Sequence, residues 1–365
     1  MRHNKLPRSS RRPLLLMLAM LLLAGITPRL QAQLTPERLY FGVGQRLVVM
    51  VGMPEESTAE PSIVLYKAGS LEEVSRAPAA RGRCDLSSLF PMLWGEKPRE
   101  VMLAQLYLDD RAYGAPLVLQ PLVTPNPAVR VDPKSLAVSE AQDAEVIFDD
   151  DRRESLKAQG RPMSEEDSER VFSGLRVYIE QEAVVQTSMG EIVFRMRPDA
   201  APNTAYNFMH LVQGGFYTNI IFHRVVAQLA DGRPFVIQVG DPSGTGSGGP
   251  GYAIDLEKST LPHDFGVLSM ARAADPDTNG SQVFVCLSKE GTSFLDGRYT
   301  SFAQAISGAD VILKIAQVAV DGNDRPFDPP MIQRAFLRDA PPIPERALPV
   351  GRDAASAPTS NEPDR

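Results

Sequence analysis

Side chains that commonly do chemistry are scarce in this chain. It has four histidines and two cysteines among 365 residues, so neither a disulfide framework nor a zinc module with clustered ligands is expected. The glycine-rich run 240–249 has the look of a phosphate loop, but the lysine that must follow the last glycine is missing. The acidic run 149–154 lacks the alternating ligands and the central glycine of an EF-hand. Zinc, calcium and phosphate-loop chemistry therefore have no motif here.

A different group of residues gathers in order along the second half of the chain. The segments read GFYTNIIFHRV (215–225), FVIQVGDPSGTG (235–246), GVLSMARA (266–273) with NGSQVFV (279–285), and SFLDG (293–297). As an ordered set they closely resemble the cyclophilin family of peptidyl-prolyl cis-trans isomerases. The resemblance extends over residues 183–335, less than half of the chain, and is greatest to the bacterial branch.

This resemblance implies an eight-stranded antiparallel barrel with a helix at each end and an apolar groove on its outer face. Arg224 matches the catalytic arginine of the family. The positions that match the lining of the proline pocket and the adjoining groove are Phe235, Val236, Gln238, Ala271, Arg272, Gln282, Phe284, Phe294, Leu295 and Tyr299. The glycine-rich run is then the glycine-rich loop of the family, and no metal or other cofactor is expected.

The residue types suit rotation about an X-Pro bond. Amide resonance opposes this rotation with a barrier of roughly 18 to 20 kcal/mol. Catalysis needs only preferential binding of the twisted amide, whose proline nitrogen carries a localised lone pair. The permanently charged guanidinium of Arg224 is suited to donate a hydrogen bond to that nitrogen. Phe235, Phe284 and Leu295 would hold the ring while Gln238 anchors a peptide carbonyl.

Simpler interpretations stay open for each residue. Arg224 is also compatible with a surface arginine paired to an acid, and the phenylalanines with barrel core. His223 is expected to pack and hydrogen-bond rather than to act as a base, because no proton is transferred. Trp94, in the first half, is more often core than a binding patch.

Several positions depart from the family pattern. Ten residues, 225–234, separate Arg224 from Phe235 where about four are usual, so the loop carries an insertion. Its polar residues predict that the insertion bulges into solvent, because lengthening a surface loop costs little free energy. The insertion is also long enough to cover part of the groove. Val236 replaces a frequent methionine and Val239 the first of two glycines. Phe294 replaces the tryptophan of many eukaryotic members, which implies weak cyclosporin binding, and Arg272 gives the groove a positive rim.

The first 32 residues have the layout of a secretory signal. Five basic residues precede an apolar run from Leu14 to Ile26, and Ala32 offers a small residue before a cut. The run is shorter than a membrane span of about 20 residues, so no stable membrane insertion is expected after cleavage. Arg11 and Arg12 also fit a twin-arginine signal, the less favoured route. We expect a periplasmic or extracellular protein.

The rest of the chain divides into four parts. Short apolar runs punctuated by Pro, Gly, Asp and Ser predict an all-β, sandwich-like accessory domain over 33–131. Residues 132–173 read as a polar linker with a short helix capped by Ser164, and 174–338 as the isomerase-like domain. Residues 339–365 are predicted to be a disordered tail. Cys84 and Cys286 fall in separate domains and are expected to be buried thiols rather than a disulfide.

The leading hypothesis is an exported isomerase that speeds X-Pro rotation in folding proteins, whose uncatalysed rate is slow. Its partners would be proline-containing peptides and unfolded proteins. The net charge of −7 argues against nucleic acid. The alternative is a catalytically weak scaffold that binds proline segments or acts as a chaperone. A third hypothesis, an envelope protein tethered by an uncleaved leader, rests on the signal region alone.

Overall fold

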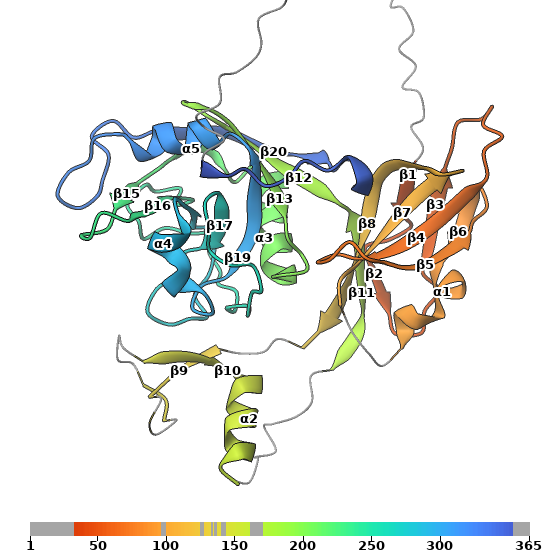
Figure 1. Ribbon diagram of the computed structural model, residues 1–365, viewed down its shortest axis with the longest axis horizontal. Coiled ribbons are helices and arrows are strands. Elements are labelled where there is room, and N and C mark those ends of the chain that lie inside the picture. Colours follow the sequence, from red (N-terminus) through yellow and green to blue (C-terminus); the bar gives the residue numbers. More distant parts are fainter. Residues whose placement is uncertain are drawn as a thin grey trace, which may run out of the picture.

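The computed structural model describes residues 33–95, 100–124, 128–132, 134, 137–139, 144–160 and 171–352. In this part of the chain two β-rich units stand side by side, and a hairpin with a helix lies against one of them (Figure 1). The predicted signal segment 1–32, Ser164 and residues 353–365 of the predicted tail lie outside the described residues. The expectation of a mainly β protein is confirmed.

The N-terminal unit is built from two antiparallel sheets. The first has the order β1 (Gln33–Pro36), β3 (Val48–Gly52), β6 (Gly82–Asp85). The second has the order β2 (Tyr40–Gly42), β11 (Phe172–Ile179), β8 (Arg111–Val123), β7 (Met102–Leu108), β4 (Pro61–Lys67), β5 (Glu73–Pro78). Two short helices, α1 (Leu86–Leu89) and η1 (Pro91–Trp94), follow β6.

Alternation along the strands places one core between these sheets and another behind the larger one. Ile63 and Leu65 of β4 join the core shared with Leu34 and Val49 of the smaller sheet. Val64 and Tyr66 join a second cluster on the opposite face. Strand β4 is therefore buried on both sides, which explains its unbroken apolar run. Trp94 packs against the first core with its ring 6.4 Å from that of Phe172, as expected for a core tryptophan.

Strand β11 shows that the boundary expected at residue 174 falls inside an element of the N-terminal unit. The strand pairs with β8 from Phe172 to Ile179 and with β2 from Gly174 to Arg176. Leu175 and Val177 belong to the core between the two sheets. The accessory sheet is therefore completed by residues that the sequence assigned to the linker and to the catalytic unit, because sheet partners need not be neighbours in the chain.

The segment predicted as a linker contains ordered structure. β9 (Ala128–Val131) pairs with β10 (Glu145–Phe148), and α2 (Asp149–Ala158) follows directly. Phe148 and Ala128 pack against Leu256 of the C-terminal unit, and Lys258 Nζ lies 2.6 and 2.8 Å from the carboxylate oxygens of Asp151. The acidic run is therefore part of a docked arm, and its helix lies before Ser164.

The C-terminal unit is a nine-stranded antiparallel sheet that curls on itself. Its order is β14 (Thr218–Ile221), β20 (Met331–Asp339), β12 (Gln181–Thr187), β13 (Gly190–Met196), β19 (Ser301–Ser307), β17 (Val267–Met270), β18 (Val283–Cys286), β16 (Pro234–Val239), β15 (Arg224–Gln228). The two edge strands, β14 and β15, are separated in sequence by Phe222 and His223 alone. Counted as one interrupted strand, they close an eight-stranded barrel.

Helices pack against this sheet, and their buried side chains join its core. α3 (Pro202–Gln213) has proline at its first position and buries Ala205, Phe208 and Met209 in the core, as the spacing predicts. The carboxylate of Glu257 accepts hydrogen bonds from the N–H groups of Asn203 and Thr204, the role of a cap. The apolar spacing of residues 310–316 predicts a second helix, and α5 (Ala309–Ala316) lies there. The short α4 (Lys289–Thr292) and η2 (Ser293–Leu295) lie beside the groove described below.

The prediction of a disordered tail from residue 339 is wrong for the residues that the structure describes. Residues 340–352, here called the C-terminal strap, include η3 (Ile343–Glu345) and contact both units. Ile343 N–H donates to Gln105 Oε1 in the N-terminal unit, and Val350 N–H donates to Ala305 O in the C-terminal unit. Arg346 pairs with Glu180 between them. The Pro- and Ala-rich composition predicts disorder, but the few apolar residues of the strap, such as Ile343 and Val350, pack against the two units.

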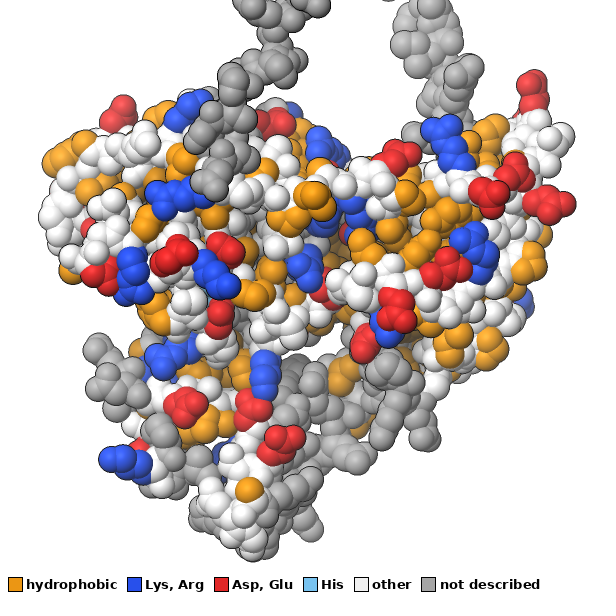
Figure 2. Space-filling model, viewed as in Figure 1, with side chains coloured by type: hydrophobic (Ala, Val, Ile, Leu, Met, Phe, Trp, Pro, Cys, Tyr) orange, Lys and Arg blue, Asp and Glu red, His pale blue; other side chains and the backbone are white. Residues whose placement is uncertain are grey.

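The surface mixes charges of both signs with scattered apolar side chains (Figure 2). Among the described residues, no helix is both long enough and apolar enough to span a membrane. Both cysteines are free thiols; Cys286 is buried, as the sequence predicts, whereas Cys84 is only partly buried.

Candidate active site

Strand alternation puts the predicted site residues on the outside of the barrel. In β16, Ile237 and Val239 face the core, whereas Val236 and Gln238 face outward. In the ladder, Arg224 stands opposite Gln238, and Gln238 opposite Phe284. Three neighbouring strands therefore bring residues far apart in sequence to one patch of the outer face.

Arg224 begins a chain of polar contacts. Its Nη1 lies 3.5 Å from Gln238 Oε1, and Gln238 Nε2 donates to Gln282 Oε1 at 3.0 Å. Gln282 Nε2 in turn donates to the carbonyl oxygens of Gly246 and Gly248, both at 2.9 Å. On its other side, Arg224 Nη2 is 3.5 Å from Asp324 Oδ2. The guanidinium is thus held loosely at two points and keeps 43% of its side-chain surface exposed.

An apolar cluster, here called the aromatic pocket after its expected role, adjoins this series of polar contacts. Buried members of its cluster are Ala200, Val236, Leu261, Val267, Phe284, Cys286 and Leu295, with Phe235, Ala271 and Tyr299 partly exposed. The Phe284 ring meets Tyr299 edge-on at 5.7 Å, and Phe235 stacks on Phe294 at 5.8 Å. Phe294 itself is 50% exposed. The floor is fixed by burial and the rim stays open.

His263 lies beneath the floor and was not singled out from the sequence. Its ring stacks on that of Phe284 at 6.0 Å, while Nδ1 is 2.7 Å from Asp296 Oδ1 and Nε2 is 2.9 Å from Ser269 Oγ. Burial lowers the pKa of His263, against the opposing effect of Asp296. Asp324 was missed as well: it lies 100 residues after Arg224, and no local pattern connects the two.

The glycine-rich loop forms one wall of the groove, next to Gln238 and Gln282. Gly240 has φ +106°, and a Cβ there would lie 2.2 Å from Ser281 O, so only glycine fits. The Asp241 carboxylate accepts hydrogen bonds from the Ser243 hydroxyl and from the N–H groups of Gly248, Ser243 and Gly246, and so holds the loop together. Burial would raise the pKa of this carboxyl, but the hydrogen bonds outweigh burial and lower it. The loop encloses a hollow of about 580 Å³ with Gln282, Ala271 and Arg272.

Arg272 sits at the rim of this hollow. Its guanidinium lies 4.5 Å from the centre of the Tyr299 ring, and its Nε donates to Arg298 O at 3.0 Å. Its Nη1 lies 3.3 Å from Ala274 O, the carbonyl to which Arg130 of the docked arm also donates, at 3.2 Å. Arg272 is thus a rim residue placed by stacking and by backbone carbonyls.

The insertion at 225–234 extends the hairpin of β15 and β16. Val226 pairs with Val236 and Gln228 with Pro234, and Leu229 N–H donates to Arg233 O across the tip. The tip is exposed, as its polar residues predict. Arg233 Nη1 donates to Glu290 O. This contact ties the hairpin to α4, so it stands beside Phe294 and leaves that ring half exposed.

Two residues fill space rather than contact the open groove. Val239 is 3% exposed in the barrel core, where a glycine would leave a void. His223 is 6% exposed, and neither ring nitrogen has a hydrogen-bond partner among the described residues. Burial lowers the pKa of His223. The packing expected for His223 is present, whereas its expected hydrogen bond is not seen there.

The structure thus brings Arg224, Gln238, Gln282 and the aromatic pocket to one face.

Residues 183–336 match the family model described as cyclophilin type peptidyl-prolyl cis-trans isomerase/CLD. A peptidyl-prolyl cis-trans isomerase of Schizosaccharomyces pombe is 39% identical over 156 residues, 41% of this chain and 95% of the relative. Peptidyl-prolyl cis-trans isomerase-like 1 of Aspergillus oryzae is 42% identical over 154 residues, 41% of this chain and 90% of the relative. A solved Cryptosporidium parvum isomerase of cyclophilin type, crystallised with the dipeptide Ala-Pro, is 32% identical, covers 43% of this chain and 99% of its own, and has a TM-score of 0.40.

Proposed function

Since this chain belongs to the cyclophilin-type peptidyl-prolyl cis-trans isomerases, we propose that Arg224 and the pocket beside it carry the isomerase activity and that the protein acts on exported polypeptides as they fold. The observation that carries the proposal is the partly exposed guanidinium of Arg224 next to the apolar cluster that contains Val236, Phe284 and Leu295. An apolar surface of this kind suits a proline ring.

The contacts of Arg224 suit a donor that acts late in the rotation. Planar amide nitrogen is a poor acceptor, whereas the nitrogen of a twisted amide carries a lone pair. A hydrogen bond made only to the twisted form lowers the barrier without trapping the ground state. Gln238 and Asp324 hold the guanidinium through contacts of 3.5 Å, which leaves donors on the fork for substrate.

The groove also has to hold one side of the bond while the other turns. The buried ring of Phe284 and the side chain of Leu295 would grip the proline, and Gln282 and Gln238 would present amide groups to the peptide backbone. Such fixation of one half of the substrate is an orientation effect. Every one of these steps is non-covalent.

The test is exchange between the cis and trans forms of a short Ala-Pro peptide, catalysed by residues 33–365 and by Arg224→Ala. We expect the variant to lose most of the acceleration, at least tenfold in kcat/KM, about 1.4 kcal/mol. Arg46→Ala is the matched control, because Arg46 is exposed on the N-terminal unit. A folded Arg224→Ala variant with full activity would remove Arg224 from the proposal.

The same experiment also tests the alternative, a catalytically weak scaffold that binds proline segments. If the wild-type chain binds the Ala-Pro peptide but leaves its exchange rate unchanged, the groove of this chain serves as a binding site for proline segments. We also propose weak cyclosporin binding, because Phe294 at the rim is smaller than the tryptophan of many eukaryotic members and is half exposed.

Export rests on the sequence of residues 1–32, which precede the described part. The basic residues, the apolar run and Ala32 support cleavage before Gln33. N-terminal sequencing of the protein recovered from its native compartment should give Gln33 as the first residue. A full-length chain found in the cytoplasm would contradict the exported role and leave the isomerase activity unaffected.

A further inference from the structure

Three arginines stand together at the rim of the hollow beside the glycine-rich loop. Arg272 lines this hollow, and its Nε donates to the backbone oxygen of Arg298 at 3.0 Å. The third, Arg130, lies on β9 of the docked arm, outside the residues 183–336 that match the family model. We call Arg130, Arg272 and Arg298 the arginine cluster. Its place next to the groove makes it a candidate for contact with a substrate chain.

Two members of the cluster converge on a single atom. Nη1 of Arg130 lies 3.2 Å and Nη1 of Arg272 lies 3.3 Å from the carbonyl oxygen of Ala274. Two guanidinium groups this close repel each other, because like charges interact strongly where water is partly excluded. Burial lowers the pKa of Arg272, and the positive charges of Arg130 and Arg298 lower it further. A negative charge bound here would relieve the repulsion.

Donors of the cluster are open to a ligand. Nε and Nη1 of Arg272 donate to the carbonyl oxygens of Arg298, Ala273 and Ala274. Nη2 of Arg272 has no partner among the described residues, yet it is not one of the buried atoms that lack a partner, so it faces solvent. The Arg298 side chain is exposed and shows no hydrogen bond or ion pair in the described part of the chain. Both guanidinium groups therefore keep donors for an incoming carboxylate.

Asp275 is an acid close to the cluster, but it does not neutralise the rim. It opposes the effect of the other arginines on the pKa of Arg272. Its carboxylate accepts a hydrogen bond from the N–H of Asp277 at 2.9 Å, and within the described residues it forms no ion pair with Arg272 or Arg298. Arg272 and Arg298 against Asp275 leave the rim positive, in a chain of net charge −7.

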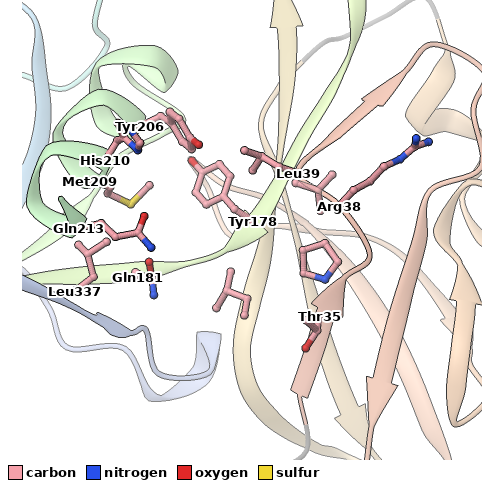
Figure 3. Close-up of a pocket in the computed structure, with 13 residues that line it drawn as sticks. Thr35, Arg38, Leu39, Tyr178, Gln181, Tyr206, Met209, His210, Gln213 and Leu337 are labelled. Carbon is pink, nitrogen blue, oxygen red and sulfur yellow. The ribbon is translucent and has the colours of Figure 1, made fainter.

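The hollow between the two units offers no such arrangement. It measures about 430 Å³ and is lined by Tyr206 and His210 of α3 on one side and by Arg38 and Leu39 on the other. Figure 3 shows the Arg38 side chain extending away from α3, and its Nη2 donates to Gln45 Oε1 at 2.7 Å. The arginine cluster is therefore the better candidate for recognition of an anion.

The docked arm fixes Arg130 beside the groove. The carboxylate of Asp277 accepts a hydrogen bond from the N–H of Ala128 on the same strand as Arg130, and Phe148 of the arm packs against Leu256. The arm thus touches the segment 274–277, which follows Arg272 in the wall of the hollow. Charged groups that are held in place before binding lower the ordering cost of recognition.

The cluster is within reach of a peptide in the aromatic pocket. The Phe284 ring meets Tyr299 at 5.7 Å, and the Arg272 guanidinium lies 4.5 Å from the centre of the Tyr299 ring. Phe284 and this guanidinium are therefore no farther apart than about three extended residues, which span about 10 Å. A side chain within three residues of a proline held against Phe284 can contact Arg272.

We propose that the arginine cluster binds a carboxylate of the substrate, so that the enzyme prefers prolines with an acidic residue within three positions. The carboxylate would accept hydrogen bonds from Arg272 Nη2 and from Arg298, and Arg130 would add positive charge from the arm. The inference rests on the proposed function, because it takes the proline ring to lie against Phe284. It adds a substrate class, and it gives the docked arm a part in substrate choice.

The probes are two peptides with acetylated and amidated ends, Ala-Glu-Ala-Pro-Ala-Ala and Ala-Ala-Ala-Pro-Ala-Glu, each beside a twin with glutamine for glutamate. Cis-trans exchange catalysed by residues 33–365 should have at least fivefold higher kcat/KM for one of the glutamate peptides than for its twin at low salt. The difference should shrink as salt is raised, because ions screen the attraction. Equal kcat/KM within both pairs would overturn the proposal.

Variants locate the preference. Arg298→Glu is the sharpest, because this side chain makes no hydrogen bond in the described part of the chain that could be lost. It should bring the ratio of kcat/KM for the glutamate and glutamine peptides to about one or below, and a lysine twin should then be the better substrate. Arg272→Gln and Arg130→Gln should each lower the ratio at least twofold.

The matched controls are Arg334→Glu and Arg334→Gln. They make the same charge changes at an exposed residue of β20 in the same unit, which does not line the hollow. Both should keep the wild-type ratio. An equal fall of the ratio in the controls would show a general charge effect and contradict the cluster. Circular dichroism checks that each variant is folded.

Titration of the same peptide pairs separates this proposal from the isomerase activity. Affinities are obtained whether or not exchange is catalysed. Tighter binding of a glutamate peptide without catalysed exchange would support the cluster and contradict the proposed activity. Catalysed exchange of both members of each pair, with equal kcat/KM and equal affinity, would keep the activity and sink the cluster.

Discussion

Arg224 is held by two partners of different character, an amide at Gln238 and a carboxylate at Asp324, each at 3.5 Å. Both members of the ion pair keep about two fifths of their side-chain surface, 43% and 42%. Pairs of this kind are worth roughly 0 to 1 kcal/mol. Asp324 therefore orients the guanidinium more than it stabilises the fold.

Replacing Asp324 with asparagine should lower kcat/KM for an Ala-Pro peptide by up to about fivefold, since 1 kcal/mol corresponds to that factor. The unfolding midpoint in urea should barely change. Asp310→Asn, at an exposed pair on α5, is the control and should retain full activity. A rise in activity, or a loss as large as that of Arg224→Ala, would contradict an orienting role.

Asp241 contributes to the fall of the free energy of unfolding at acid pH. Its folded pKa lies below the usual value because the loop donates several hydrogen bonds to the carboxylate. The stabilisation is therefore present above the unfolded pKa of about 4 and is lost as the pH falls through and below it. Asp241→Asn should be less stable than wild type by about 1 to 3 kcal/mol at pH 7, with a gap that narrows below pH about 4. Urea unfolding at pH 7, 5 and 3.5 measures this; a constant gap would count against it.

Among single residues, those in contiguous motifs were predictable and those supplied by distant loops were not. Arg224, Gln238 and Phe284 lie on paired strands at positions that the motifs mark. His263 and Asp324 reach the same site from loops. A buried histidine and a loop aspartate look like many others in a sequence, because only the tertiary fold gives them neighbours.

At the scale of elements, the extended hairpin of β15 and β16 is the main departure from a compact groove. Its tip is exposed, and the Arg233 contact to Glu290 O holds it against α4. Phe294 beside it remains 50% exposed. The hairpin therefore borders the pocket without closing it.

Replacing residues 229–233 by Asn-Gly, a turn that suits a two-residue hairpin, should change kcat/KM less than about threefold. The residues removed form no part of the pocket cluster. Exchange with the Ala-Pro peptide and with a longer proline peptide measures the effect. A tenfold gain for the longer peptide would show that the hairpin shades the groove after all.

Elements with a clear period were predictable, and those joined to distant strands were not. Apolar spacing predicts the helices α3 and α5, and Met189-Gly190 predicts the turn between β12 and β13; the structure has all three at these positions. β11 was placed on the wrong side of a boundary because its strand pattern says nothing about its partners, β2 and β8. Composition likewise failed for the C-terminal strap.

At the scale of the whole molecule, the strap joins the two units through a buried ion pair. The side chains of Arg346 and Glu180 are 8% and 5% exposed. Burial raises the pKa of Glu180, and Arg346 counters it. Without Arg346, the carboxylate would stay buried next to Glu182 with weaker compensation.

Arg346→Met should therefore destabilise the protein by about 3 to 5 kcal/mol at pH 7, read as a lower urea midpoint. Adding Glu180→Gln should restore much of the loss, because the unpaired charge is gone. The loss in Arg346→Met should also shrink at acid pH, where Glu180 takes up a proton. Equal stability of wild type and Arg346→Met would show that the strap is not coupled to folding.

The insertion of β11 between β2 and β8 sets an order of events as the chain emerges, N-terminus first, into the compartment where it folds. β2 and β8 both emerge before the chain reaches Phe172, and each pairs directly with β11 in the finished sheet. Until that strand is made, a nascent chain carries two unpaired strand edges, which invite pairing with other chains. Slow emergence of residues 124–171 would lengthen this exposure, and the rate at which that stretch arrives would govern the yield of folded protein.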